Sequence, residues 1–304
     1  MLLPLALPTD IILVSVQGGN LASRQIALDK NNLRGFSYRF TLYTLLFVGC
    51  AIMLLPFFWM VTTSLKTSNE VMSFPPKWIP SNLQWINYIK AWRAAPFGYY
   101  FFNSFFIAIT TTIGELITSV LAAYAFAKMR FFGKNVLFAI MLGTLMIPGE
   151  MLLVPNYVTI THLHWYNHYQ ALIIPWLASV FGIFLLRQFF RSIPDELLDA
   201  ARIDGCSRFR FLWRIVVPLS KPAIMTVALL KFIGSWNAFL WVLIMTSSDK
   251  MRTVPVGLAL FSSDVGTIYE QLMAAAVMAI IPILILFFFT QKQFIQGIAR
   301  TGIK

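Results

Sequence analysis

Charged residues are scarce in this chain of 304 residues: Asp, Glu, Lys and Arg make up 12% of it, against roughly 25% in soluble domains. Several stretches of 20 or more residues hold at most one charge, and 58% of the chain is hydrophobic. A helix of that length crosses a hydrocarbon core roughly 30 Å thick. The composition excludes an ordinary soluble enzyme and predicts an all-helical integral membrane protein.

Cysteine and nucleotide-binding glycine patterns are also sparse. The two cysteines, Cys50 and Cys206, form no CxxC or zinc-like pattern, so neither a disulfide framework nor a metal fold is indicated. No GxxxxGK[ST] phosphate loop occurs, and residues 1–16 lack the basic region of a secretory signal. We therefore expect a non-catalytic chain that binds no cofactor itself.

Acidic residues are half as frequent as basic ones, 12 against 24, which gives a net charge of +12. The basic residues lie mainly in short loops, 17 on one side of the apolar segments and 6 on the other, with Lys231 inside a segment. Positive-inside topology explains this bias without nucleic acid and places both termini in the cytoplasm.

The apolar segments predict a membrane domain over residues 39–304, preceded by a cytoplasmic lead-in, residues 1–38. We expect six spans, at about residues 40–64, 101–127, 136–158, 171–190, 223–246 and 272–290. The longest cytoplasmic loop is then residues 191–221.

Two short helices are predicted in this loop. Ser192, with Asp195 three residues later, is typical of a helix N-cap, and Gly205 is typical of a helix end. Ala200 and Ala201 would let a partner protein approach the first helix closely. The loop either docks into a groove of such a partner or lies as an amphipathic helix at the lipid headgroups.

The second helix shows apolar residues at helical spacing and ends before the fifth span at a proline. The pattern consists of Phe209, Leu212, Trp213 and Val216, followed by Pro218.

The loop resembles the EAA signature of bacterial ABC importer permeases: E-A-A, three residues, Gly, nine residues, I-x-L-P. Asp199 replaces the Glu and Val217 the Leu, and every spacing is kept. The resemblance implies that the loop is the coupling helix that docks on a separate ATPase subunit. The coupling residues are then Glu196, Asp199, Ala200, Ala201, Asp204, Gly205, Ile215 and Pro218.

The resemblance extends over about residues 40–304. Segments such as MIPGEMLLVPNY (146–157), WNAFLWVLI (236–244) and the tail QKQFIQGIARTGIK are similar to the carbohydrate-uptake class, and within it to the second, maltose MalG-type permease. It implies a type I importer fold in the bacterial inner membrane and alternating access for a sugar or related polyol. Glycerol 3-phosphate or its diesters are the alternative.

The partners that the resemblance implies are a homologous second permease, two ATP-binding subunits that use ATP and Mg, an external solute-binding protein and membrane lipid. Two other classes of function stay open. An ion-coupled secondary transporter would be expected to show inverted repeats, which we do not find. A receptor or scaffold would use the loop only to recruit a cytoplasmic protein.

Three ionisable residues lie within predicted spans. Glu115 and Lys231 should face the bundle interior or water, where they either line the solute path or tie helices together. Glu150 lies in the span that Pro148 and Pro155 interrupt, where irregular backbone needs protein or an aqueous cavity to cover it. It is a candidate for a gate or cavity lining.

Aromatic residues in the fifth span offer sugar-binding chemistry. Trp236, Asn237, Phe239 and Trp241 either contact the solute or serve as packing and interfacial anchors. His162, His164 and His168 suggest metal, but without a carboxylate or cysteine nearby we expect no metal site and favour an external loop that contacts the solute-binding protein.

Overall fold

The computed structural model describes the backbone of residues 21–259 and 267–301, and the side chains of residues 38–259 and 267–291. Every regular element in these ranges is helical, which confirms the predicted fold class. The chain divides into two compact units, residues 1–58 and 59–304. The predicted lead-in is helical from Leu21 onward, and its first 20 residues lie outside the described ones.

The elements follow one another in a fixed order along the chain. They are α1 (Leu21–Ser64), α2 (Ser68–Val71), α3 (Ile86–Ala94), α4 (Phe97–Lys128), α5 (Lys134–Gly143), η1 (Thr144–Met146), η2 (Gly149–Leu152), α6 (Leu153–His162), α7 (Tyr169–Ile173), η3 (Ile174–Trp176), α8 (Val180–Arg191), α9 (Asp195–Ile203), α10 (Arg208–Phe211), η4 (Leu212–Val216), α11 (Val217–Leu219), α12 (Lys221–Trp236), α13 (Leu240–Met245), η5 (Asp249–Met251), α14 (Val254–Ala259) and α15 (Tyr269–Thr301).

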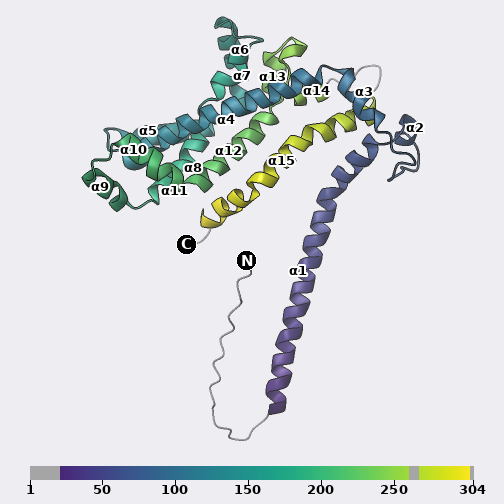
Figure 1. Cartoon of the computed structure of the whole chain (residues 1–304), viewed down its shortest axis with the longest axis horizontal. Helices are drawn as coiled ribbons and strands as arrows, with labels where there is room; N and C mark the ends of the chain where they lie inside the picture. Colours follow the sequence, from purple (N-terminus) through teal and green to yellow (C-terminus); the bar gives the residue numbers. More distant parts are fainter. Residues whose placement is uncertain (1–20, 260–266, 302–304) are drawn as a thin grey trace. The chain divides into compact units, whose positions relative to one another are not determined.

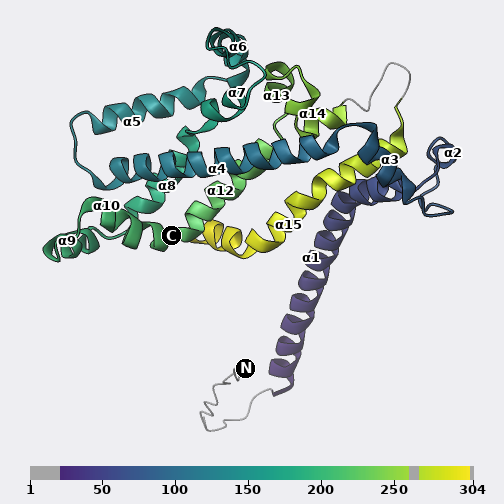
Figure 2. The same ribbon diagram turned by 45° about the horizontal axis from the view of Figure 1, so that its top comes forward.

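The second unit is a helix bundle built around α4. Helices α8 and α12 pack along α4, and α15 packs along α12 (Figures 1 and 2). The buried face of α4 carries small and hydroxyl residues, including Ala108, Thr111 and Ser119. Such residues let membrane helices approach closely.

The predicted spans meet different outcomes. Four helical segments are long and apolar enough to cross a membrane, at Tyr38–Ser64, Phe97–Lys128, Tyr169–Arg191 and Tyr269–Gln291. The predicted third span is a pair of helical segments bent by 90°. With each of the two bent pairs counted as one span the number is six, whereas the orientation remains a prediction.

The predicted fifth span, residues 223–246, is wrong as a single helix. Helix α12 ends at Trp236, and the apolar residues after the break form the separate helix α13. The segment that makes a bent pair with α12 is Arg208–Leu219, at 80°. Val242 and Met245 of α13 are buried against α7 instead, so their apolar character reflects packing between helices.

Two apolar clusters position the functional regions. One surrounds the end of α4 and joins it to α8, α9 and η4. The other joins the middle of α4 to α7, α13 and α14. The first supports the loop after α8, and a cavity lies along α4 and α12 between the two clusters.

Candidate functional site

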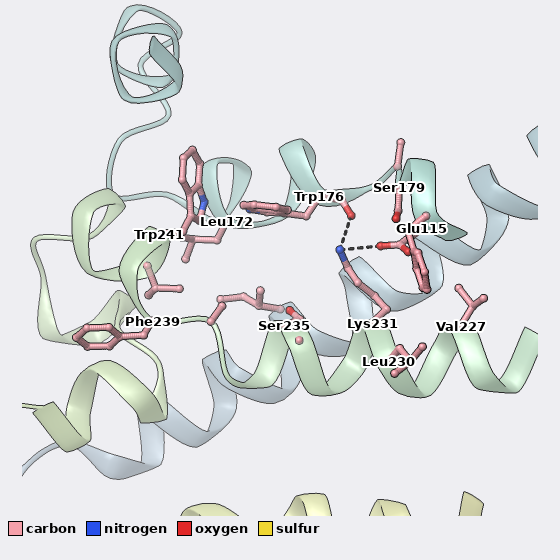
Figure 3. Close-up of a pocket in the computed structure, with 16 residues that line it drawn as sticks. Glu115, Leu172, Trp176, Ser179, Val227, Leu230, Lys231, Ser235, Phe239 and Trp241 are labelled. Atoms are coloured by element: carbon pink, nitrogen blue, oxygen red, sulfur yellow. Dashed lines mark hydrogen bonds and ion pairs between the residues drawn. The ribbon is translucent and has the colours of Figure 1, made fainter. Parts of the chain in front are cut away.

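A cavity of about 500 Å³ lies among α4, α8, α12 and α13 (Figure 3). Its volume falls in the range of small-molecule sites, roughly 300–1,000 Å³. Glu115, Lys231 and Phe239, all predicted from the sequence, lie on its lining. The structure therefore brings together three candidates from two segments that are more than 100 residues apart in sequence.

A break in the fourth apolar segment forms one wall of this cavity. The chain leaves α7 at Ile173 and starts α8 after Ser179, whose hydroxyl accepts a hydrogen bond from the Gly182 amide at 3.2 Å. The carbonyl of Leu177 accepts a hydrogen bond from Thr118 Oγ1 at 2.5 Å. Irregular backbone at membrane depth is tolerated where it lines a cavity or is buried in protein, and this break meets both conditions.

Lys231 and Glu115 form an ion pair across the cavity wall. Lys231 Nζ lies 2.7 Å from Glu115 Oε2, and the two side chains are 14% and 5% exposed. The same ammonium donates to the carbonyl of Trp176 at 3.0 Å and lies 5.6 Å from the centre of its ring (Figure 3). The pair thus ties α12 to α4 and to the break, and it also faces the cavity.

Gly182 allows α8 to approach this pair. A Cβ atom at position 182 would lie 3.0 Å from Ser119 Oγ and 3.1 Å from Glu115 Oε1. Both distances are tighter than ordinary van der Waals contacts. Glycine therefore fits this site because of the close approach of two helices.

An aromatic wall stands beside the ion pair. The rings of Trp176 and Trp241 meet edge to face at 5.6 Å between their centres. Trp241 Nε1 donates to the carbonyl of Ala171 at 3.0 Å, which fixes this ring in place. Both tryptophans line the cavity.

The other predicted pathway residues lie away from the cavity. Trp236 is 2% exposed and packs against the rings of Phe101 and Phe105. Of the two roles considered for it, packing is therefore the one that the structure supports. Asn237 is an exposed C-cap residue of α12 outside the cavity lining. Glu150 is exposed beside the bend between η1 and η2.

Sequence reasoning missed part of the cavity wall. Trp176 and Ser179 line it from the break after α7, Phe181 lines it from the first turn of α8, and Ser235 lines it from α12. Pro175 is the signal that could have found the first three, because proline disrupts helical hydrogen bonding within an apolar run.

The three histidines form no metal cluster in the structure. No group of three His, Cys, Asp or Glu side chains that could hold a metal ion occurs among the described residues. His168 Nδ1 lies 2.8 Å from the carbonyl of Tyr166. The contact with a solute-binding protein remains a prediction.

The loop after α8 forms the second candidate site. Its first helix, α9, ends at Ile203, and Gly205 provides the predicted stop two residues later with a left-handed φ of +70°. The amide of Cys206 donates to the carbonyl of Ala201 at 2.8 Å, and the amide of Gly205 donates to that of Arg202 at 3.0 Å. These bonds resemble a Schellman ending, which glycine favours because it has no Cβ.

The start of α9 differs from the prediction. Ser192 is wrong as its N-cap, because its hydroxyl donates to the carbonyl of Phe189 at 2.7 Å at the end of α8. Pro194 stands at the N-cap instead and provides no side-chain hydrogen bond. Asp195 and Glu196 occupy the first turn, where negative charge complements the helix dipole.

Helix α9 has an inward and an outward face. Leu198 and Ala201, each 7% exposed, pack into the apolar cluster at the end of α4. Ala200 is exposed, as is Ile203 at 88%. Of the two alanines in the motif, Ala200 is the one available to a partner protein.

The second helix of the loop contains a π turn, η4, which shifts its predicted face. Phe211, Leu212 and Val216 are buried, whereas Phe209 and Trp213 remain exposed with their ring centres 6.0 Å apart. The π turn has a wider repeat than the α-helix, so the four apolar residues at α-helical spacing do not share one buried face.

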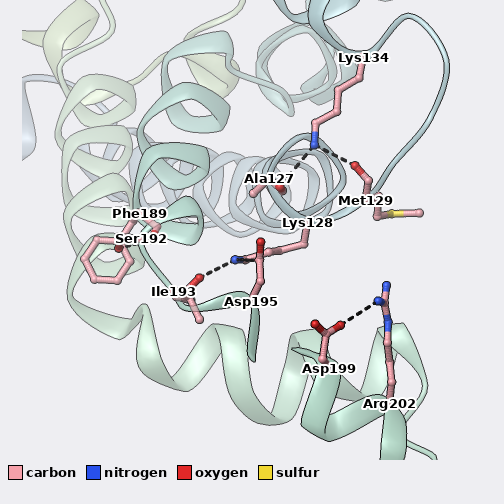
Figure 4. Close-up of polar contacts among 10 residues, drawn as sticks. All are labelled: Ala127, Lys128, Met129, Lys134, Phe189, Ser192, Ile193, Asp195, Asp199 and Arg202. Atoms are coloured by element: carbon pink, nitrogen blue, oxygen red, sulfur yellow. Dashed lines mark hydrogen bonds and ion pairs between the residues drawn. The ribbon is translucent and has the colours of Figure 1, made fainter. Parts of the chain in front are cut away.

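Lys128 attaches this loop to the end of α4. Its Nζ donates to the carbonyl of Ile193 at 2.5 Å and to Asp195 Oδ1 at 2.6 Å (Figure 4). The hydrogen bond from Lys128 lowers the pKa of Asp195 below its usual value. The stabilisation from Asp195 is therefore present above its ordinary pKa and is lost as pH falls through the lowered value.

Replacing Lys128 by methionine should loosen α9. The Lys128 side chain is 4% exposed, and its loss leaves the Ile193 carbonyl without this donor. An unmade bond of this kind costs about 1–3 kcal/mol, so hydrogen exchange in residues 192–206 should rise about tenfold. Asp195→Asn is the control, since Asp195 is 78% exposed and should change exchange by less than about threefold. Unchanged exchange in Lys128→Met would show that this contact does not hold the loop.

Comparison with known proteins agrees with the motif. Residues 115–300 match the family described as the binding-protein-dependent transport system inner membrane component. The matched region holds the ion pair and the whole loop after α8.

Two curated relatives cover most of the chain. The sn-glycerol-3-phosphate transport system permease protein UgpE of Yersinia enterocolitica is 36% identical over 84% of this chain and 94% of its own. The arabinooligosaccharides transport system permease protein AraQ of Bacillus subtilis is 35% identical over 88% of this chain and 96% of its own.

Solved structures share the fold. A chain of a bacterial ABC transporter involved in the import of the acidic polysaccharide alginate aligns over 92% of this chain and 100% of its own, with a TM-score of 0.73 and 22% identity. A chain of a bacterial alginate ABC transporter in complex with an alginate pentasaccharide-bound periplasmic protein aligns over 84% and 94%, with a TM-score of 0.61 and 15% identity.

Proposed function

Because this chain belongs to the family of binding-protein-dependent transport system inner membrane components, we propose that it is the permease subunit of an ATP-driven importer for a sugar or related polyol. It is a multi-pass inner-membrane protein. The arabinooligosaccharide relative supports the sugar assignment. The relative named for sn-glycerol 3-phosphate keeps that phosphate ester as the second candidate solute.

The observation that carries the proposal is the outward face of α9. An exposed, capped helix with Ala200 at its surface is anchored through Lys128 to α4, a helix that lines the cavity. ATP-binding subunits, which use ATP and Mg, would dock there. Their closure would move α9 and α4 together and change the access of the cavity from one side of the membrane to the other.

The complete importer contains four kinds of component under this proposal. They are this chain, a homologous second permease, two ATP-binding subunits and an external solute-binding protein. No step of ATP hydrolysis is assigned to this chain. Glu115 and Lys231 belong to its solute path, whereas an ion relay by a stand-alone transporter gains no support from the family match.

Purification and transport together test the proposal. The tagged chain, extracted in mild detergent, should carry with it a second permease and an ATP-binding subunit identified by mass spectrometry. Proteoliposomes that contain this complex and its solute-binding protein should accumulate radiolabelled arabinotriose, or another neutral sugar of a test panel, only with ATP. Recovery of the chain alone, with uptake that survives ATP depletion, would favour a secondary transporter.

A further inference from the structure

The charge of the cavity discriminates between the two candidate solutes. Among the described residues of its lining, Glu115 and Lys231 are the charged ones, one of each sign. They lie 2.7 Å apart, so each neutralises the other. The lining therefore carries no net charge, although a basic residue faces the cavity.

An anionic solute would meet a resident competitor. Lys231 is the cation that a phosphate or carboxylate would seek, but its ammonium already contacts the Glu115 carboxylate and the Trp176 carbonyl. Glu115 is 5% exposed, so water could not solvate its carboxylate if an anionic solute displaced it from Lys231. A second anion would have to displace this carboxylate or lie beside it, and like charges at short range repel strongly in a poorly hydrated site.

A neutral polyhydroxylated solute would meet suitable partners. An ammonium has three donors, and the contacts with Glu115 and Trp176 account for two of those of Lys231. Ser179 Oγ accepts from the Gly182 amide at 3.2 Å and can still donate its own hydroxyl hydrogen to a solute oxygen. Thr111 Oγ1 donates to the Ile107 carbonyl at 2.7 Å, so Ser235 Oγ, 3.1 Å from Thr111 Oγ1, offers a solute its remaining acceptor capacity.

The aromatic wall adds an apolar surface to these donors. Trp241 holds its ring in place by donating from Nε1 to the Ala171 carbonyl, and the Trp176 ring packs edge to face against it. The C–H faces of a sugar ring can pack on such rings while its hydroxyl groups reach the polar lining. The wall and the donors lie on the same cavity, so one solute can contact both.

We propose that the cavity selects an uncharged saccharide or polyol, and that Glu115 is the specificity-determining residue because it neutralises Lys231. This inference rests on the proposed function and names the solute class of the same site. Without the Glu115 charge, Lys231 would become available to anions, and the selectivity would shift toward phosphate esters.

Direct binding to the purified complex tests the selectivity. Tryptophan fluorescence follows titration with arabinotriose, maltotriose and glycerol as neutral probes and with sn-glycerol 3-phosphate as the anionic probe. At least one neutral probe should bind at least tenfold more tightly than the phosphate, and Trp241→Phe should reduce the signal. Equal or tighter binding of the phosphate, or no binding of any neutral probe, would overturn the proposal.

Two variants test the role of Glu115. Glu115→Gln should raise the affinity for sn-glycerol 3-phosphate at least tenfold and should shift the ratio of phosphate to saccharide affinity toward the phosphate by at least the same factor. Glu115→Gln combined with Lys231→Met removes both charges and should return the preference to that of the unmodified chain. This double variant serves as the folded test if the single variant is unstable. A gain of phosphate affinity in the double variant, or none in a folded single variant, would contradict the role.

Failure of the proposed selectivity can be distinguished from failure of the proposed function. ATP-dependent uptake of glycerol 3-phosphate, with weak saccharide binding, would retain an importer permease and reject the selectivity. Loss of ATP dependence would reject the importer itself.

Discussion

Replacing Lys231 by methionine is expected to destabilise the chain by about 3–5 kcal/mol, the usual cost of leaving one member of a buried ion pair alone. The substitution keeps the length of the side chain but leaves the Glu115 carboxylate, 5% exposed, without its cation. It also removes the donor to the Trp176 carbonyl. The temperature at which the purified complex loses its monodisperse elution peak should fall by about 10 °C.

The added substitution Glu115→Gln should recover most of this loss, because it removes the unpaired charge. Recovery should stop short of complete, since the Trp176 carbonyl still lacks its donor. Lys77→Met is the matched control: Lys77 is 52% exposed and lies 4.0 Å from Glu70, so its pair should contribute less than about 1 kcal/mol. A double variant as unstable as Lys231→Met would show that the two charges do not act together.

Substituting Ala200 by glutamate should reduce transport strongly while the chain stays folded. Ala200 is exposed on the outward face of α9, where a larger charged side chain would prevent close docking of the ATP-binding subunit. Recovery of that subunit in a pull-down and ATP-driven uptake should each fall about tenfold or more, the effect of roughly 1.4 kcal/mol at an interface. Thermal stability of the separated chain should not change.

Ala201→Glu provides the contrast at the neighbouring position. Ala201 is 7% exposed within the apolar cluster at the end of α4, so a carboxylate there is buried without a partner. This variant should lower thermal stability as well as transport. Normal docking and uptake in Ala200→Glu would show that the outward face of α9 is not part of the proposed ATPase interface.

Structural features that depend on residues close together in the sequence could be predicted from the sequence. Gly205 ends α9 because a left-handed position selects glycine whatever the tertiary surroundings. The approximate limits of α4 and α15 could also be predicted, because the length and apolar composition of a sequence segment suffice to identify a membrane span.

Features that depend on distant packing could not be predicted. Trp236 and Trp241 lie in the same apolar stretch of the sequence, with similar residues around each. Of the two, Trp241 lines the cavity and Trp236 does not. Trp236 meets Phe101 and Phe105 of α4, a contact that no local spacing specifies. The pairing of Glu115 with Lys231 likewise depends on how α4 and α12 pack, so the sequence could propose it but not decide it.

The π turn and the break after α7 were missed for a related reason. A regular helical repeat was assumed where the backbone changes its hydrogen-bonding pattern. At the break, the carbonyls of Trp176 and Leu177 find side-chain donors on α12 and α4. The sequence of the break alone does not contain those donors.

The 90° bend between η1 and η2 should affect the stability of the protein against degradation in the cell. Residues 143–152 are exposed around it, and irregular backbone does not persist in contact with lipid. In the proposed importer, the second permease or an aqueous chamber would cover this bend. We therefore expect copies that lack the proposed partner to be degraded by membrane proteases from this point, and the abundance of the chain to rise when the second permease is co-expressed.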